Sequence, residues 1–311
     1  MAAELTDTAN AHSCVDPRQA DACMSGVTDH DNARVDVDGH ADRGWRAHLT
    51  LEFRSEQGRT VFRRRHSGPL YVQRAFHQGD GVCHVYVLHP PGGLAGGDRL
   101  ILSCVAETGT AALVTTPAAT KFYRSLGASS RQEQIIRVAP DASFEWLPLD
   151  TILFGGSRAQ ISTQVRLAAS SRFVGWEMTS IGRRLSGDDY PSGRLDQRTE
   201  IFVDGEPRLL DRMLFDAGDP ILVRAWGLGE RDVFGSLYAY PADSRVLACA
   251  RDPLAAFGTL RAGATCVDGL LVLRALAPGA EALRDAFESI WAAIRVPVIG
   301  RAPSAPRIWR T

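Results

Sequence analysis

The stretch His89-Pro90-Pro91-Gly92-Gly93-Leu94-Ala95-Gly96-Gly97-Asp98 stands between two apolar runs of the chain. These runs, residues 82–88 and 99–105, are typical of short β-strands. Glycine adopts backbone conformations closed to other residues and proline fixes its own φ, so the stretch predicts a tightly folded loop between two strands. We expect this loop to present His89 and Asp98 near its two ends.

Glycine-rich loops can bind phosphate, but the spacing here is wrong for that function. A dinucleotide-binding fingerprint needs G-x-G-x-x-G at the start of a helix, and a phosphate-binding loop ends in G-K-[ST]. Neither pattern occurs in the stretch, and an alternating strand follows it where a helix N-terminus would be needed. The loop therefore favours close packing of two strands over nucleotide binding.

Short strands are expected along most of the chain. From Trp45 to Arg54 apolar and polar residues alternate, which predicts a half-buried strand, and residues 60–65 return as its hairpin partner. Further short apolar runs separated by Gly or Pro continue to residue 167, and Asp204-Gly205 and Asp268-Gly269 are typical hairpin turns. The pattern predicts a mainly β protein built of layered sheets of short strands.

Helical periodicity appears in two places. An apolar stripe follows Pro278-Gly279 and is formed by Leu283, Phe287, Ile290, Trp291 and Ile294. It predicts a helix near the C-terminus that Pro297 ends. A shorter helix is expected over residues 246–257, with an interruption at Pro253. The sequence has no repeat of fixed length, which argues against a regular repeat solenoid.

Composition describes an ordinary globular chain of 311 residues, 45% hydrophobic and 23% charged. The N-terminus does not resemble a secretory signal, and no apolar run is long enough to span a membrane. Six cysteines occur without CxxC spacing, which argues against a zinc site and for a reduced, cytoplasmic protein. No basic run is interleaved with aromatic residues, so nucleic acid is not an expected partner.

Residues 1–43 differ from the rest of the chain. They carry nine acidic residues against three arginines, a net charge of −6, and contain no aromatic residue. Such a segment cannot bury enough apolar surface to offset its chain entropy. We therefore expect a disordered acidic tail over residues 1–43 and a single β-rich domain over residues 44–311.

Several carboxylates stand inside apolar runs. Glu145 lies between Phe144 and Trp146, Asp150 follows Leu149, and Glu177 follows Trp176. A carboxylate buried without a partner costs several kcal/mol. Strand alternation leaves a simpler interpretation open, in which each carboxylate faces solvent while its neighbours face the core. No G-x-S-x-G or H-E-x-x-H motif occurs, so the sequence does not support a known hydrolase or zinc-protease site.

Five motifs, taken in order, resemble the urease accessory protein family UreD, also called UreH. They are the His89–Asp98 loop, Thr115-Thr116-Pro117-Ala118-Ala119-Thr120-Lys121-Phe122-Tyr123-Arg124-Ser125, Trp146-Leu147-Pro148-Leu149-Asp150-Thr151-Ile152-Leu153-Phe154-Gly155-Gly156, Gly175-Trp176-Glu177 and Gly182-Arg183. The resemblance extends from about Trp45 to the end of the chain. It implies a β-rich, helically wound stack of strands with two helices.

The resemblance also implies a function without catalysis. Proteins of this family help to deliver nickel to apo-urease, bound to the urease on one side and to UreF on another, and through UreF they recruit the GTPase UreG. A water-filled tunnel is the proposed route, so Ni²⁺ would pass transiently and no cofactor would be tightly bound. Transferred to this chain, the resemblance makes Asp98, Glu145, Asp150 and Glu177 candidates for the metal path, with His89 and Lys121 as weaker ones.

One motif departs from the family pattern. The family usually has Trp-Leu-Pro-Gln-Glu-Thr-Ile where this chain has Trp146-Leu147-Pro148-Leu149-Asp150-Thr151-Ile152. Asp150 keeps the carboxylate but shortens its reach, and Leu149 removes an amide. Passage of a metal that depends on charge would survive this change, whereas a fixed ligand geometry is put in doubt.

Other interpretations remain open at this point. Two of Glu145, Asp150 and Glu177 could form the acid–base pair of a carbohydrate-active hydrolase, with carboxyl groups about 5–10 Å apart across a cleft. A plain interaction module would carry all its carboxylates on the surface. The segment after Thr116 could open a short helix with Pro117 at its first position, which would make Lys121 part of a structural corner.

Overall fold

The computed structural model describes residues 44–310, so the predicted disordered tail, residues 1–43, lies outside the described residues. In chain order the strands are β1 Arg46–Glu56, β2 Arg59–Ser67, β3 Ala75–Phe76, β4 Cys83–Tyr86, β5 Gly93–Leu94, β6 Arg99–Ala106, β7 Ala111–Thr115, β8 Thr120–Phe122, β9 Ser130–Val138, β10 Ser143–Trp146, β11 Thr151–Leu153, β12 Arg158–Leu167, β13 Arg172–Ile181, β14 Arg194–Val203, β15 Glu206–Asp216, β16 Val233–Tyr240, β17 Arg261–Val267 and β18 Leu270–Ala277. The helices are α1 Pro220–Val223, α2 Ser244–Arg251 and α3 Ala280–Ile299, and 3₁₀ turns cover Arg184–Ser186, Asp252–Ala256 and Arg307–Arg310.

The strands form two sheets. The first has seven strands in the order β15-β14-β12-β9-β6-β1-β2. Its five central strands are parallel, and an antiparallel hairpin closes each edge. The second has eleven strands, with the path β17-β18-β16-β13-β10-β7-β4-β3 and the short strands β11, β8 and β5 extending it beside β13. The predicted mainly β, layered architecture is confirmed.

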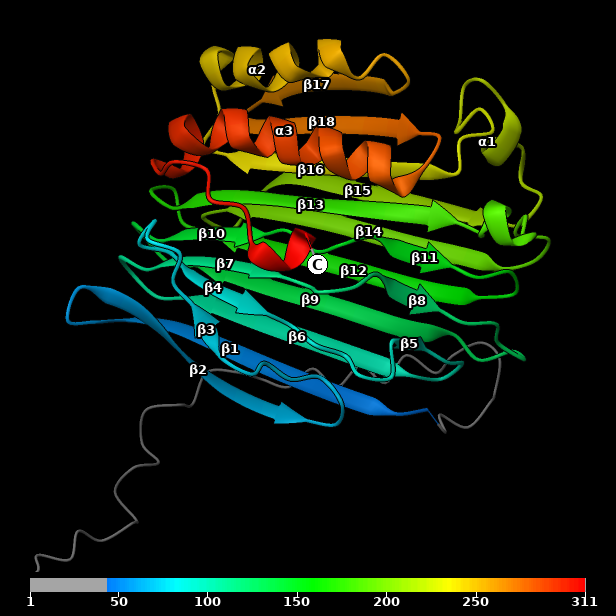
Figure 1. Cartoon of the computed structure of the whole chain (residues 1–311), viewed down its shortest axis with the longest axis horizontal. Coiled ribbons are helices and arrows are strands. Elements are labelled where there is room, and N and C mark those ends of the chain that lie inside the picture. The colour runs from blue at the N-terminus through cyan, green and yellow to red at the C-terminus, as the bar shows by residue number, and fades with distance from the viewer. Residues whose placement is uncertain (1–43, 311) are drawn as a thin grey trace, which may run out of the picture. The chain divides into compact units, whose positions relative to one another are not determined.

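The parallel strands arise because the chain winds as a coil between the two sheets (Figure 1). The coil passes from β6 to β7 and β8, then to β9, to β10 and β11, to β12, to β13 and finally to β14. The coils differ in length, since their strands in the first sheet begin at Arg99, Ser130, Arg158 and Arg194. The helically wound stack of strands that the resemblance implied is therefore confirmed, and the arrangement is solenoid-like although the sequence has no repeat of fixed length.

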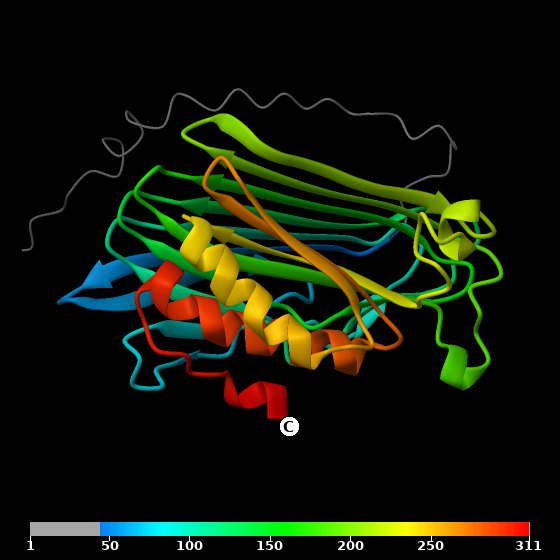
Figure 2. The same ribbon diagram turned by 90° about the horizontal axis from the view of Figure 1, so that it is seen from above.

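Two buried clusters hold these layers together. The first lies between the sheets, where for example the rings of Phe53 and Phe144 meet edge to face with their centroids 5.8 Å apart. The second lies between the eleven-stranded sheet and the helices, and it contains Trp176, Phe287 and Trp291. Figure 2 shows α2 and α3 on the side of the molecule opposite to β14 and β15. The eleven-stranded sheet therefore has buried residues on both faces of its central strands, such as β4, β7 and β10, whereas its edge strand β17 is mostly exposed.

The helix predictions hold with one correction and one omission. α3 carries the predicted stripe, but it continues through Pro297 to Ile299 and ends at Gly300, which has φ +78°. Pro297 has no N–H group and cannot donate the usual hydrogen bond of a helix. The helix continues past it because Val298 and Ile299 are buried in the second cluster. α2 ends at Arg251 and a 3₁₀ turn follows through Pro253, as predicted. The four-residue helix α1 was not predicted.

The glycine-rich loop is tightly folded, as predicted. A Cβ added at Gly44 would lie 2.0 Å from the carbonyl carbon of Gly97, so the backbones approach too closely for any side chain at Gly44. The loop also contains β5, which pairs with β8. Because Lys121 lies on β8, a helix after Pro117 is wrong, and the neighbouring short strands β5 and β11 are what hold this segment extended. Within residues 44–310 no helix has both the length and the apolar character to cross a bilayer.

Candidate functional site

Polar side chains interrupt the apolar layer between the two sheets. On the seven-stranded sheet, register places Gln134 of β9 beside Thr163 of β12, then Thr199 of β14, then Asp211 of β15. Gln134, Thr163 and Thr199 are each less than 6% exposed. Buried amides and hydroxyls cost about 1–3 kcal/mol each when left without partners, so a row of them requires a matching set of polar groups.

Glu177 of β13 meets this row from the other sheet. Its carboxylate accepts hydrogen bonds from Thr163 Oγ1, from Gln197 Nε2 at 3.1 Å and from Thr199 Oγ1 at 2.7 Å. The network extends on both sides, since Thr163 Oγ1 also lies 3.0 Å from Gln134 Oε1, and Thr179 Oγ1 lies 2.9 Å from Gln197 Oε1. All three partners of Glu177 are uncharged.

The environment of Glu177 disfavours its charged form. Burial away from bulk water raises the pKa of this carboxyl above its ordinary value of 4.5, and the nearby carboxylate of Asp211 adds to the rise. The hydrogen bonds from Thr163, Thr199 and Gln197 oppose it without cancelling it. A positive ion placed beside Glu177 would therefore be stabilised by a carboxylate that has no cationic partner among residues 44–310.

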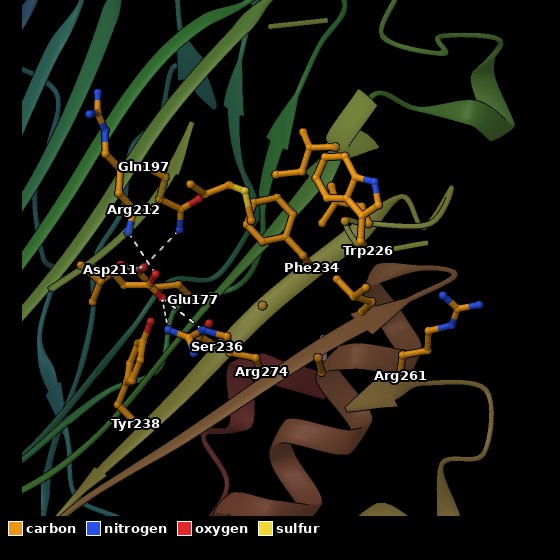
Figure 3. Close-up of a pocket in the computed structure, with 18 residues that line it drawn as sticks. Glu177, Gln197, Asp211, Arg212, Trp226, Phe234, Ser236, Tyr238, Arg261 and Arg274 are labelled. Carbon is orange, nitrogen blue, oxygen red and sulfur yellow. Dashed lines mark hydrogen bonds and ion pairs between the residues drawn. The ribbon is translucent and has the colours of Figure 1, made fainter. Parts of the chain in front are cut away.

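Three cavities lie between the two sheets and are lined in part by these polar side chains. The β15-side cavity, shown in Figure 3, has a volume of about 350 Å³. Its lining comprises Glu177, Gln197, Thr199, Asp211, Arg212, Met213, Ile221, Trp226, Gly227, Leu228, Phe234, Gly235, Ser236, Tyr238, Arg261, Arg274, Ala275 and Leu276. The loop-side cavity has about 260 Å³ and includes the polar side chains of His89, Thr116, Thr120, Gln132 and Gln134 in its lining. Between them lies a neck of about 30 Å³.

The neck shares lining residues with both larger cavities. With the β15-side cavity it shares Glu177 and Gln197. With the loop-side cavity it shares Thr116, Thr120, Gln132, Gln134 and Trp146. Its volume is about a tenth of the volume of either larger cavity. The three spaces thus form a line that crosses the strands from the His89 loop to the β15 edge, with Glu177 at the boundary of the narrowest part.

Of the six candidate path residues, His89 and Glu177 line these cavities. His89 lies half-buried at the loop-side cavity. Burial lowers the pKa of its imidazole, while the carboxylate of Asp98 acts in the opposite direction. A neutral imidazole can accept a hydrogen bond or bind a metal ion, so the environment favours the form of His89 that could contact a passing cation.

Glu145 lies on the other face of the eleven-stranded sheet and does not line these cavities. It is 1% exposed, accepts a hydrogen bond from Trp291 Nε1 at 2.7 Å, and forms an ion pair with Arg295 of α3 at 2.8 Å. The idea that Glu145 faces solvent is therefore wrong, because α3 covers it. Glu145 and Glu177 point away from each other across the sheet, so they do not form the acid–base pair of a hydrolase.

The remaining three candidates have structural contacts outside the cavity linings. Asp98 accepts the backbone N–H groups of Trp45 and Ala95, both at 2.8 Å, and so closes the glycine-rich loop. Asp150 Oδ2 accepts a hydrogen bond from Ser180 Oγ at 2.9 Å. Lys121 lies on β8 between β5 and β11. Within residues 44–310, no group of three His, Cys, Asp or Glu side chains could hold a metal ion.

Most of the cavity lining was missed by sequence reasoning. Gln132, Gln134, Gln197 and Thr199 carry no recognisable motif, yet each occupies an inward position of its strand. A usable signal existed in the alternation itself, because Gln132 and Gln134 share a face with Ile136 and Val138, which are buried. Glutamine at positions that alternation assigns to the core indicates a polar interior.

The fold defines a class of solenoid-like β protein whose two stacked sheets enclose a line of polar cavities. The UreD urease accessory protein family model matches residues 45–310 of the chain. Among named relatives, urease accessory protein UreD of Alkalilimnicola ehrlichii is 48% identical over 86% of this chain and 92% of its own length. The Klebsiella aerogenes and Vibrio parahaemolyticus proteins of the same name are 40% and 39% identical, over 98% and 97% of their lengths and 86% of this chain. The chain belongs to the UreD family.

Proposed function

We propose that this protein serves urease maturation by passing Ni²⁺ along the line of cavities between its two sheets. The role in maturation follows from the family, whose members are named urease accessory proteins. The observation that carries the transit proposal is Glu177, a carboxylate with only uncharged partners at the boundary between the β15-side cavity and the neck. Ni²⁺ is the cargo in this proposal and has no resident site.

The chemistry of the lining suits an ion that must leave again. A divalent cation would lose hydration in a space as small as the neck, and the neck is lined by Thr116, Thr120 and Gln134, whose side-chain oxygens would replace lost water in this proposal. Oxygen ligands hold Ni²⁺ less tightly than the imidazole and thiolate groups that form stable nickel or zinc sites. The carboxylate of Glu177 supplies the charge that offsets part of the dehydration cost.

The same geometry suggests where partners act. A path with one end at the His89 loop and the other at the β15 edge has room for a donor at one end and a recipient at the other. We propose apo-urease as the recipient, UreF as a direct partner and UreG as a partner reached through UreF. The function we propose is therefore that of a non-catalytic conduit inside an assembly.

The test compares Glu177→Gln with the matched control Glu200→Gln. Glu200 lies on the outward face of β14, where it accepts a hydrogen bond from Gln164. Each variant is co-expressed with the urease subunits and the other accessory proteins, and complex formation is measured by pull-down. We expect Glu177→Gln to assemble normally while the nickel content and activity of the urease fall about tenfold, which corresponds to a barrier raised by ~1.4 kcal/mol.

The control variant should load urease like the unmodified protein. Normal nickel content in the Glu177→Gln sample would refute transit past this residue. Loss of the complex together with activity would assign Glu177 to folding or docking instead.

A further inference from the structure

The β15-side cavity opens at an end of the molecule where both sheets finish. Its walls come from β14 and β15 of one sheet and β16 and β18 of the other, and the loop after α1 contributes Trp226 and Leu228. Register places Glu177 beside Ser236 and Ser236 beside Arg274, so Glu177 and Arg274 are two strands apart, roughly 10 Å, on the same face. Arg274 therefore lies nearer the β17 edge of the sheet than Glu177 does, and both line the cavity.

The charge at this mouth does not favour entry of a cation. Arg274 Nη2 pairs with Asp211 Oδ2 at 2.8 Å, which occupies the second carboxylate of the cavity (Figure 3). Arg212 turns to the outer face, where it pairs with Asp196. Arg261 has no carboxylate partner among residues 44–310, and its guanidinium lies against the loop after α1, 2.9 Å from a Cβ that would be added at Gly229. The mouth therefore presents a free positive charge and a neutralised Asp211.

The surroundings of the mouth resemble a protein contact. Trp226 is 73% exposed although it lines the cavity, and Val223 at the end of α1 is 55% exposed. Exposed tryptophan next to arginine is the combination that dominates protein–protein interfaces. We define the rim as Trp226, Arg261 and Arg274. Its aromatic surface and guanidinium groups are complementary to a polypeptide segment that carries carboxylates.

We propose that an acidic segment of a partner protein docks on the rim and draws Arg274 away from Asp211, which leaves Asp211 and Glu177 both facing the cavity. The second half of this inference rests on the proposed transit function. The exchange is feasible because the side chains of Arg274 and Asp211 are 57% and 32% exposed, and exposed ion pairs contribute little to stability. The ion pair between Arg274 and Asp211 is replaced by one between Arg274 and a carboxylate of the partner. Docking would therefore supply the free energy that releases Asp211 into the cavity.

The docking test uses the double variant Trp226→Ala/Arg261→Glu. The matched control is Trp45→Ala/Arg63→Glu, since Trp45 is 62% exposed, Arg63 is 65% exposed, and both lie by the β1–β2 hairpin at the opposite edge of the first sheet. Binding to purified apo-urease and to purified UreF is measured at two salt concentrations. We expect the rim variant to bind one of them at least about tenfold more weakly, with a reduced salt dependence, and the control to bind normally. Unchanged binding to both partners would overturn the docking site.

The opening is tested on the isolated protein with Ni²⁺ alone. Arg274→Ala should bind Ni²⁺ about tenfold more tightly than the unmodified protein, because removal of the guanidinium frees Asp211. Arg274→Ala/Glu177→Gln should lose that gain. Equal Ni²⁺ affinity in Arg274→Ala and the unmodified protein would overturn the displacement of Arg274.

The two proposals fail in different ways. If Glu177→Gln loads urease normally while the rim variant loses its partner, transit is wrong and docking stands. If Glu177→Gln blocks loading while the rim variant binds both partners, docking is wrong and transit stands.

Discussion

Glu145 and Glu177 have the same local sequence pattern, a glutamate between large apolar residues on a strand of one sheet, and opposite environments. Glu145 faces the layer under α3, where Arg295 neutralises it and Asp80 Oδ2 pairs with the same guanidinium at 3.0 Å. Glu177 faces the space between the sheets, where hydroxyl and amide groups solvate it and cavities reach it. A buried carboxylate with its own cation holds elements together, whereas one without a cation remains available to an ion that arrives.

The largest effect on the free energy of unfolding should come from removing the arginine that pairs with Glu145. Arg295→Met leaves Glu145 buried without a positive charge and leaves Asp80 with His84 as its remaining side-chain partner, so the free energy of unfolding should fall by about 3–5 kcal/mol. Urea denaturation measures the loss. Glu177→Gln should change it by less than about 1 kcal/mol, because neutralising this side chain removes no ion pair.

A rescue sharpens that result. Arg295→Met/Glu145→Gln removes the cation and the nearer carboxylate together, so it should recover part of the loss. A single-variant loss below about 1 kcal/mol would mean that the two environments do not differ as described.

The two regions should respond to pH with opposite signs. The pKa of Glu177 is raised above 4.5, so the folded state binds this proton more tightly than the unfolded state, and stability falls as pH rises from 4.5 through the folded pKa. The pKa of Asp80 is lowered below 3.8. Burial opposes this shift, but hydrogen bonds from His84, the backbone of Val82 and Arg295 outweigh it. The stability that Asp80 contributes is therefore complete above pH 3.8 and is lost as pH falls through its folded pKa.

Urea denaturation at several pH values across this range measures both effects. The free energy of unfolding of Glu177→Gln and of Asp80→Asn is compared with that of the unmodified protein at each pH. The stability of Glu177→Gln relative to the unmodified protein should increase as pH rises. The stability deficit of Asp80→Asn relative to the unmodified protein should shrink as pH falls. Differences that stay constant with pH would show that neither carboxyl has the environment described here.

The smallest effect concerns one hydroxyl of the second environment. Thr199→Val removes a hydrogen bond to Glu177 Oε2, so we expect a loss of about 1 kcal/mol at neutral pH. It should also raise the pKa of Glu177 further, since this hydrogen bond lowers it. Thr265→Val, at an exposed position of β17, is the control and should leave stability unchanged. Equal effects of the two variants would mean that Thr199 does not solvate the carboxylate.

Strands, hairpin turns and the main helix were predictable because their signals are local. Alternation located β1 and β6, Asp204-Gly205 and Asp268-Gly269 located two hairpins, and a stripe of apolar residues located α3. Local signals failed where burial outweighed them, as at Pro297, and where pairing partners were distant, as for the Lys121 strand.

The candidate site was predictable only in part. Motifs indicated His89 and Glu177, while the glutamines and threonines that complete the lining carry no motif. Alternation shows that the side chains of Glu145 and Glu177 point to the opposite side of their strands from the adjacent residues. It does not show which side of each strand faces the space between the sheets. Tertiary structure alone decided that Glu145 meets Arg295, 150 residues away, and that Glu177 meets an interior with polar cavities. The physical reason is that periodicity is set by neighbours along the chain, whereas the solvation of a buried charge is set by whichever distant elements pack against it.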